Sequence, residues 1–216
     1  MIRTVITDMD GTLIDSEGAI ALAGKEALVD WGICCQLPDF LPFTGRGDDR
    51  FIGGVSEKYG VPYDPAMKLR AYEIYDATAD ERIRVFDWSE RLLAFFKARG
   101  MKLGIASAAD RFRVERNIKR LGFSPEDFDA VTSANDVTRQ KPDPDVFLRA
   151  MEKMGADPRE TVIFEDATMG VRAAKAAGAY CIAVTTSYDA EALYREGADL
   201  VMPDPARICD ILEIFG

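Results

Sequence analysis

The sequence contains no histidine among its 216 residues. This absence excludes Ser-His-Asp and Cys-His triads, H-E-x-x-H metalloproteases and zinc sites with histidine ligands. Any acid–base chemistry must therefore fall to carboxylates, lysine or tyrosine.

Cysteines and long apolar runs are also scarce. No apolar run reaches the ~20 residues that a membrane span needs, and the N-terminal segment lacks the profile of a signal peptide. We therefore expect a cytoplasmic protein with no membrane partner. No C-x-x-C pair is present, so a zinc site is difficult to build and reduced thiols are expected at the four cysteines: Cys34, Cys35, Cys181 and Cys209.

The sequence carries fewer basic than acidic residues. Lys and Arg number 27 against 37 Asp and Glu, which gives a formal net charge of −10. Nucleic acids and anionic membranes select for basic surfaces, so neither is an expected partner. We expect a monomer that binds a small molecule. If that molecule carries phosphate, an acidic protein needs a local source of positive charge, and a metal ion is the simplest one.

Short β-branched or apolar runs alternate with amphipathic segments along most of the chain. This alternation predicts an α/β fold, with a Rossmann-like parallel sheet and helices on both faces. Ser89 and Asp110 are predicted to cap the helices that they begin, and Gly155 to end a later one. The predicted strands are Arg3–Thr7, Lys102–Ala106, Ala130–Thr132, Thr161–Phe164, Tyr180–Val184 and Asp199–Met202.

Residues 16–84 interrupt this alternation, because they contain no convincing strand. Their pattern predicts helices over Ile20–Trp31, Asp49–Tyr59 and Pro65–Ala79. We therefore predict a small helical cap, residues 16–84, inserted after the first strand of a core that comprises residues 1–15 and 85–216.

The first predicted strand ends in Asp8-Met9-Asp10-Gly11-Thr12. Carboxylates at positions i and i+2 point the same way along a continuing strand, and Gly11 permits a sharp exit from it. One carboxylate could act as a nucleophile and the other as a general acid and base. Acidic pairs are common on protein surfaces, so this pair alone is a weak indication.

Other polar residues follow later strands. Ser107 comes after one strand and the pair Glu165-Asp166 after another, while Lys141 lies in a loop before a helix. Ligands of open parallel sheets bind outside the carboxyl ends of the strands, so these residues are expected to form one site. Taken singly, Ser107 could satisfy backbone donors and Lys141 could be a solvated surface lysine.

Electrostatics favours a metal ion in such a site. Asp8, Asp10, Glu165 and Asp166 would converge with Lys141 as the only evident cation. Two carboxylates about 4 Å apart repel by about 4 kcal/mol at an effective dielectric constant of about 20. A hard divalent cation would offset this repulsion, and Mg²⁺ suits oxygen ligands and phosphate best.

In order, D-x-D-G-T, a serine at a strand end, K-P-x-P and E-D resemble the motifs of haloacid dehalogenase superfamily phosphohydrolases. The pattern is similar to the β-phosphoglucomutase-like branch over essentially the whole chain. The resemblance implies that Asp8 forms an aspartyl-phosphate. It also implies that Asp10 protonates the leaving oxygen and later activates water. True dehalogenases of the superfamily lack this second aspartate.

The resemblance also implies the ligands. Mg²⁺ would be held by Asp8, the Asp10 backbone carbonyl and Asp166, with Glu165 helping directly or through water. The phosphate would be bound by Ser107, the Ala108 amide and Lys141.

The chain departs from the mutases of this branch at two cap positions. Ile20 stands where they carry a histidine, and an ungapped match places Asp48 where they carry an arginine in the substrate loop. Arg46 and Arg50 lie nearby as candidate specificity residues, although both could be plain solvated charges. These departures favour hydrolysis of a small phosphorylated metabolite, with a sugar phosphate as the expected substrate.

Two alternative functions remain open. The first is a sugar-phosphate mutase of the β-phosphoglucomutase type. The second is a phospho-aspartate switch module, which the sequence disfavours because receiver domains place the acceptor on a later strand and have no large cap.

Overall fold

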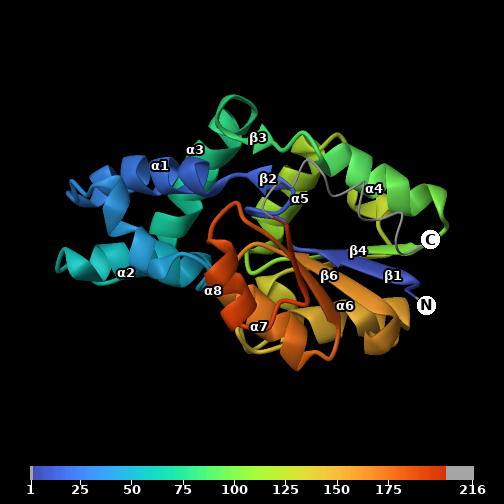
Figure 1. The fold of residues 1–216 in the computed structure, drawn as a ribbon. Coiled ribbons are helices and arrows are strands. Elements are labelled where there is room, and N and C mark those ends of the chain that lie inside the picture. Colours follow the sequence, from blue (N-terminus) through green and yellow to red (C-terminus); the bar gives the residue numbers. More distant parts are fainter. Residues whose placement is uncertain (1, 203–216) are drawn as a thin grey trace. The chain divides into compact units, whose positions relative to one another are not determined.

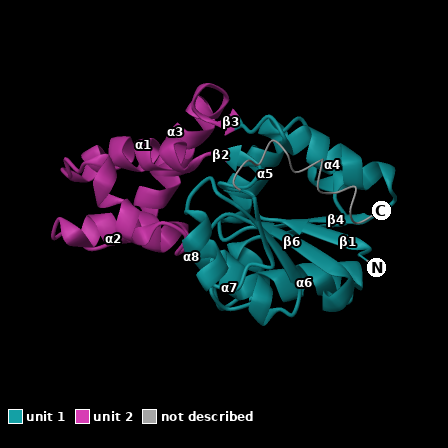
Figure 2. Ribbon diagram, in the orientation of Figure 1, with its two compact units in different colours: residues 1–14, 85–216 teal, residues 15–84 magenta. Residues whose placement is uncertain are grey.

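The computed structural model describes residues 2–202, which form two compact units. Unit 1 takes in the chain up to Ile14 and from Val85 onward, and unit 2 is Asp15–Arg84 (Figure 2). The chain crosses between the units at two short strands, β2 (Ile14–Asp15) and β3 (Arg84–Val85), which pair with each other.

A six-stranded sheet forms the centre of unit 1 (Figure 1). The strand order is β5-β4-β1-β6-β7-β8, and every neighbouring pair is parallel. The predicted α/β fold is thus confirmed, and no predicted strand differs from the observed one by more than one residue at either end. The strands are β1 (Thr4–Thr7), β4 (Lys102–Ala106), β5 (Ala130–Thr132), β6 (Thr161–Glu165), β7 (Tyr180–Val184) and β8 (Leu200–Met202).

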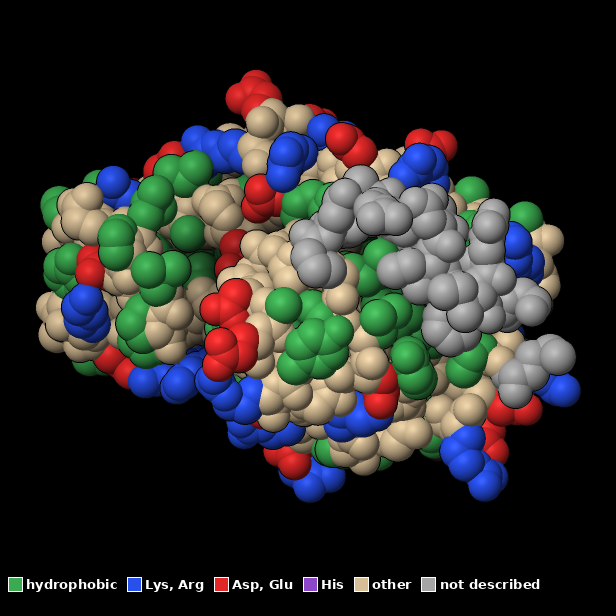
Figure 3. Space-filling view, in the orientation of Figure 1, with side chains coloured by type: hydrophobic (Ala, Val, Ile, Leu, Met, Phe, Trp, Pro, Cys, Tyr) green, Lys and Arg blue, Asp and Glu red, His purple; other side chains and the backbone are tan. Residues whose placement is uncertain are grey.

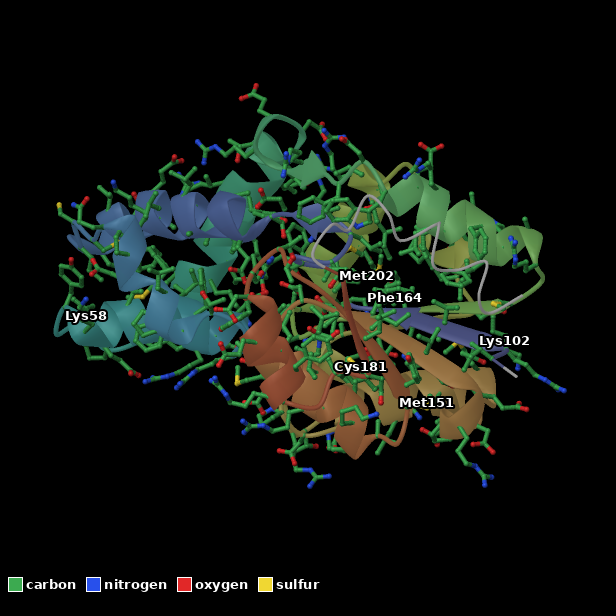
Figure 4. All side chains as sticks on the ribbon, viewed as in Figure 1. Lys58, Lys102, Met151, Phe164, Cys181 and Met202 are labelled. Carbon is green, nitrogen blue, oxygen red and sulfur yellow. The ribbon has the colours of Figure 1, made fainter. Side chains whose placement is uncertain are left out.

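One face of the sheet is covered by α6 (Asp145–Met154), α7 (Thr168–Ala176) and α8 (Ala190–Arg195) (Figure 1). Their apolar side chains share a buried cluster with Ile6, Ile163 and Cys181 of the strands, and Figure 4 labels Cys181 together with Met151 of α6. Cys34, Cys35 and Cys181 are free thiols, as predicted, and Cys209 lies outside the described residues.

The opposite face carries α4 (Ser89–Ala98) and α5 (Arg111–Arg120) (Figure 1). Consecutive strand residues point to opposite sides of a sheet, so Phe164 faces α4 although its neighbour Ile163 faces α6 and α7. The rings of Phe96 and Phe164 lie 5.8 Å apart between centroids.

The start of α4 corrects one prediction. Trp88, and not Ser89, occupies the N-cap position. The buried Ser89 hydroxyl instead donates to the Leu13 carbonyl at 2.6 Å, and the Trp88 indole N–H donates to the Thr12 carbonyl at 3.1 Å. Buried hydroxyls need a partner, and the turn after β1 supplies one. The first turn of α4 therefore anchors the D-x-D-G-T segment.

Two other predicted helix boundaries match the structure. Asp110 occupies the N-cap position of α5. Gly155 ends α6 in the left-handed conformation, with φ of 59°.

Unit 2 is helical, with α1 (Glu17–Leu28), α2 (Asp48–Lys58) and α3 (Pro65–Arg82). Asp64 caps α3 by accepting the Ala66 N–H at 2.9 Å, and Pro65 fits the first helical position because it lacks an N–H. The predicted helices are confirmed with shifted ends. The first spans Glu17–Leu28 instead of Ile20–Trp31, with Val29–Trp31 forming a 3₁₀ turn, and α3 continues three residues past Ala79 to Arg82.

Among the described residues, short 3₁₀ turns lie at Val29–Trp31, Leu37–Asp39, Leu41–Phe43, Pro125–Asp127, Ala134–Asp136 and Pro158–Glu160. Within residues 2–202, no helix has both the length and the apolar character of a membrane span. On the face drawn in Figure 3, acidic and basic side chains are intermixed.

Candidate active site

The register of the sheet brings the predicted site residues to one edge, the one formed by the carboxyl ends of the strands. Thr7 of β1 pairs with Ile105 of β4 and with Phe164 of β6, so the chain leaves all three strands at the same level. The Asp8 N–H still donates to the Phe164 carbonyl at 2.9 Å, which extends β1 by one ladder bond. The residues that emerge at this edge are Asp8, Ser107, Glu165 and Asp166.

A tight turn after β1 presents Asp8 and Asp10. The Gly11 N–H donates to the Ile14 carbonyl at 2.7 Å, and Gly11 has φ of 84°. A Cβ at Gly11 would lie 2.0 Å from Oδ2 of Asp166. Glycine is therefore required here both for its backbone conformation and for the space that the Asp166 carboxylate occupies.

Lys141 connects two of the carboxylates. Its Nζ donates to Oδ1 of Asp8 at 2.6 Å and to Oε1 of Glu165 at 2.5 Å, and the residue is 8% exposed. Burial lowers the pKa of Lys141, but the charges of Asp8 and Glu165 outweigh burial and raise it above its ordinary value. Lys141 is therefore a buried cation, and its peptide bond to Pro142 is cis.

The carboxylates carry more negative charge than Lys141 compensates. Burial raises the pKa of Asp8; Lys141 opposes this shift, while the charges of Glu165 and Asp10 add to it. Burial also raises the pKa of Asp166, and the charges of Glu165 and Asp8 raise it further. Carboxylates so close together repel each other unless a cation is bound.

Three hydroxyl groups bond Asp166 and the adjacent turn after β1. The Asp166 carboxylate accepts hydrogen bonds from the hydroxyls of Thr12, at 3.1 Å, and Ser187. The neighbouring Thr186 hydroxyl donates to the Gly11 carbonyl at 2.5 Å. Sequence reasoning missed Thr186 and Ser187, because the loop after β7 carries no motif, and it assigned Thr12 no role.

Glu165 has both oxygens engaged by protein groups. Oε1 accepts from Lys141, and Oε2 accepts the N–H groups of Asp166 and Ala167, each at 2.9 Å. This geometry fits a residue that holds Lys141 and the start of the loop before α7. Metal coordination by Glu165, directly or through water, stays a prediction.

Asp10 is held from the other side of the site. Its Oδ1 accepts from Arg113 Nη2 at 3.0 Å and from Asn117 Nδ2 at 3.1 Å, and its Oδ2 accepts from the Ser107 hydroxyl at 3.3 Å. The Ser107 oxygen in turn accepts the Ala109 N–H at 3.0 Å. The predicted phosphate-binding Ser107 thus lies beside the predicted acid.

Two further observations concern this edge. Ala108, whose amide is predicted to bind phosphate, is half-buried beside Ser107. Arg113 and Asn117 were not predicted as site residues. The available signal was their i, i+4 spacing on an amphipathic helix that begins just after Ser107.

The donor set fits Mg²⁺. Among residues 2–202, no three His, Cys, Asp or Glu side chains gather into a metal cage. Mg²⁺ does not require one, because it binds one or two carboxylates and takes water and phosphate oxygens as its other ligands. Asp8 and Asp166 are near enough for the charge of one to raise the pKa of the other. With the Asp10 carbonyl they offer hard oxygen donors.

The predicted specificity residues belong to unit 2. Arg46 is exposed, while Arg50 pairs with Glu57 at 2.6 Å and lies 5.2 Å from the centroid of the Phe43 ring. Selection of substrate by Arg46 and Arg50 stays a prediction.

Asp48, which stands at the position of the mutase arginine, is buried. It accepts the Tyr72 hydroxyl at 2.7 Å, so this position is engaged within unit 2.

The chain is similar to known hydrolases over nearly its whole length. The family model described as haloacid dehalogenase-like hydrolase matches residues 5–184. Protein SUPPRESSOR OF QUENCHING 1, chloroplastic, of Arabidopsis thaliana is 37% identical over 96% of the chain, which spans 20% of that protein. Validoxylamine A 7'-phosphate phosphatase of Streptomyces hygroscopicus subsp. limoneus is 31% identical, with 94% of each chain covered. The crystal structure of CbbY from Rhodobacter sphaeroides with phosphate matches at a TM-score of 0.84 and 25% identity over 96% of each chain.

Proposed function

We propose that this chain, which belongs to the haloacid dehalogenase-like hydrolase family, is a Mg²⁺-dependent phosphatase that hydrolyses small phosphorylated metabolites. The observation that carries the proposal is the buried Lys141, which bonds Asp8 and Glu165 at the sheet edge where Asp10 and Asp166 also lie. A buried cation beside a carboxylate nucleophile is suited to a phosphate group, which is itself anionic. The phosphatase named among the similar proteins supports this reading.

The proposed chemistry has two half-reactions. In the first, an Asp8 oxygen attacks phosphorus while the bond to the leaving oxygen breaks, and the Asp10 carboxyl gives its proton to that oxygen. In the second, Asp10 takes a proton from water as the water attacks the aspartyl-phosphate, which restores Asp8. Throughout both steps Lys141 and the Ala108 N–H bind the phosphoryl oxygens, and the Ser107 hydroxyl, which donates to Asp10 in the free protein, turns to them when substrate binds. Mg²⁺, when bound by Asp8, Asp166 and the Asp10 carbonyl, would offset the charge of the transferring group.

We prefer hydrolysis to a sugar-phosphate mutase reaction because of two residues in unit 2. A mutase must retain and reposition a bisphosphate, which requires cationic groups outside the core site. Here Ile20 is apolar, and Asp48 is an acid bonded to Tyr72.

A phospho-aspartate switch is disfavoured because Asp10, a second carboxylate able to activate water, lies two residues from Asp8. A sugar phosphate remains the preferred substrate.

The test is phosphate release from a panel of sugar phosphates, with Mg²⁺ or EDTA, for wild type, Asp8→Asn and the exposed control Asp87→Asn. We expect release that requires Mg²⁺, falls on the order of 10³-fold or more in Asp8→Asn, and is unchanged in Asp87→Asn. Undiminished release by Asp8→Asn would exclude the proposed nucleophile. Isomerisation of a sugar 1-phosphate without net phosphate release, stimulated by bisphosphate, would favour the mutase.

A further inference from the structure

Arg113 and Asn117 of α5 contact the carboxylate of Asp10 and have no part in the chemistry described above. We propose that both are positioning residues, which hold the Asp10 carboxyl where it can deliver a proton to the leaving oxygen of the substrate. This inference rests on the proposed phosphatase function and adds two residues to its machinery.

The contacts fix both oxygens of the carboxylate. Arg113 and Asn117 lie four positions apart, on one face of α5, and both donate to Oδ1, while Ser107 donates to Oδ2. Arg113 and Asn117 keep Oδ1 in place when the Ser107 hydroxyl turns to the phosphate, and Oδ2 is then free to carry the proton toward the leaving oxygen. The turn after β1 fixes the backbone of Asp10, and α5 fixes its side chain.

The two side chains of α5 that bond Asp10 are buried although both are polar. Arg113 is 6% exposed and Asn117 is fully buried, on a helix whose apolar residues Val114 and Ile118 are also buried. A guanidinium and an amide are costly to bury unless they are paired, and apolar residues would pack a helix more simply. The Arg113 guanidinium is paired with Asp10, which lies 103 residues away in the sequence.

A second arginine on the same helix provides the contrast. Arg111 bonds Asp136 and donates to the Val131 carbonyl at 3.3 Å, contacts that join α5 to the neighbouring β5 region. Arg111 thus has a structural partner, whereas Arg113 is bonded to the proposed acid. Arg111→Met is therefore the matched control, because it removes a guanidinium from α5 without touching Asp10.

Proton delivery depends on the position of the acid. In the first half-reaction the bond from Asp8 to phosphorus forms, the bond to the leaving oxygen breaks, and the Asp10 proton moves to that oxygen. The proton donor must lie within hydrogen-bond reach of the leaving oxygen, and a misplacement of about 1 Å can cost about 10²-fold in rate. An alkoxide leaving group needs this proton, whereas nitrophenolate is stable without it.

The test compares kcat/KM for an alkyl phosphate, glycerol 1-phosphate, with kcat/KM for p-nitrophenyl phosphate. This constant reports the steps up to phosphoryl transfer to Asp8 and so isolates leaving-group protonation. We expect Arg113→Met to lose about 10- to 100-fold on the alkyl ester and less than about threefold on the aryl ester. Asn117→Ala should show a smaller loss with the same selectivity, and Arg113→Lys should recover part of the loss.

The matched control separates positioning from folding. Arg111→Met should lower thermal stability yet leave the ratio of the two kcat/KM values at its wild-type level. If Arg113→Met does not fold, Asn117→Ala and Arg113→Lys carry the same comparison.

Equal losses on both esters, or no loss, would overturn the inference while leaving the phosphatase proposal intact. A wild type that hydrolyses neither these two esters nor any sugar phosphate of the panel above would overturn the proposed function, and the inference with it.

Discussion

At Gly170, in the first turn of α7, the backbone passes against the side chain of Glu165. A Cβ at this position would lie 1.9 Å from the Glu165 carboxyl carbon, a contact that no rotamer adjustment of alanine can relieve. Glu165 in turn bonds Lys141 and the amides at the start of the loop. One missing methyl group thus allows the carboxylate that holds Lys141 to lie beneath α7.

We therefore predict that Gly170→Ala destabilises the protein by about 1–3 kcal/mol, through overpacking, and impairs phosphatase activity by displacing Glu165. Gly18→Ala is the control, because Gly18 lies in α1 with no atom within 4 Å of the added Cβ. That variant should be stabilised by up to about 1 kcal/mol through its higher helix propensity. Urea unfolding measures both, and equal stabilisation of the two variants would contradict the close contact.

At the scale of elements, Asp136 joins three segments of unit 1. It accepts hydrogen bonds from Arg111 of α5, from Lys153 of α6 at 2.8 Å, and from the Ser133 N–H and hydroxyl, each at 2.9 Å. Burial alone would raise the pKa of Asp136, but the hydrogen bonds from Lys153 and Ser133 outweigh it and lower the pKa to about 2.

We predict that Asp136→Asn loses about 2 kcal/mol of stability at pH 7. Because the folded-state pKa lies below the ordinary value of 3.8, this stabilisation is present above about pH 4 and is lost as the pH falls toward 2. The gap between wild type and variant in urea unfolding should therefore narrow from pH 7 to pH 3. Asp143→Asn, which removes an exposed ion pair with Arg139, should change stability by less than about 1 kcal/mol at any pH. A gap for Asp136→Asn that is independent of pH would contradict this account.

The grouping of site residues at the strand ends could be predicted from the sequence, because the carboxyl ends of all strands in a parallel sheet lie on the same side of it. That rule was sufficient to bring Asp8, Ser107 and Glu165 together. It could not identify Arg113, whose contact with Asp10 depends on the orientation of α5, nor Ser187, which lies in a loop without periodicity. Ser89 was misassigned because a cap and a buried donor require the same residue type at a helix start.

At the scale of the whole molecule, the proposed metal site would link metal binding to folding. The carboxylates of Asp8, Glu165 and Asp166 repel one another when no divalent cation is bound. They come together only in the folded state. A ligand that binds only the folded state stabilises it by about 2.7 kcal/mol at 100 times its Kd. The protein should therefore be more stable with Mg²⁺ than without it.

We predict that Mg²⁺ raises the Tm of the wild type in a concentration-dependent manner, and that Asp166→Asn abolishes most of this rise. The exposed control Asp87→Asn should respond as the wild type does. Differential scanning calorimetry measures the effect without any substrate. An undiminished rise in Asp166→Asn would remove this residue from the proposed metal site.

The most direct test of the central claim is chemical trapping of the aspartyl-phosphate. Asp10→Asn lacks the proposed base for the second half-reaction, so p-nitrophenyl phosphate, whose leaving group needs no acid, should phosphorylate this variant and leave the adduct in place. Borohydride reduces an acyl phosphate to an alcohol, which converts the phosphorylated aspartate to homoserine. We predict that peptide mass spectrometry finds homoserine at position 8 alone. An unmodified Asp8, or reduction at another carboxylate, would contradict the assignment of Asp8 as the nucleophile.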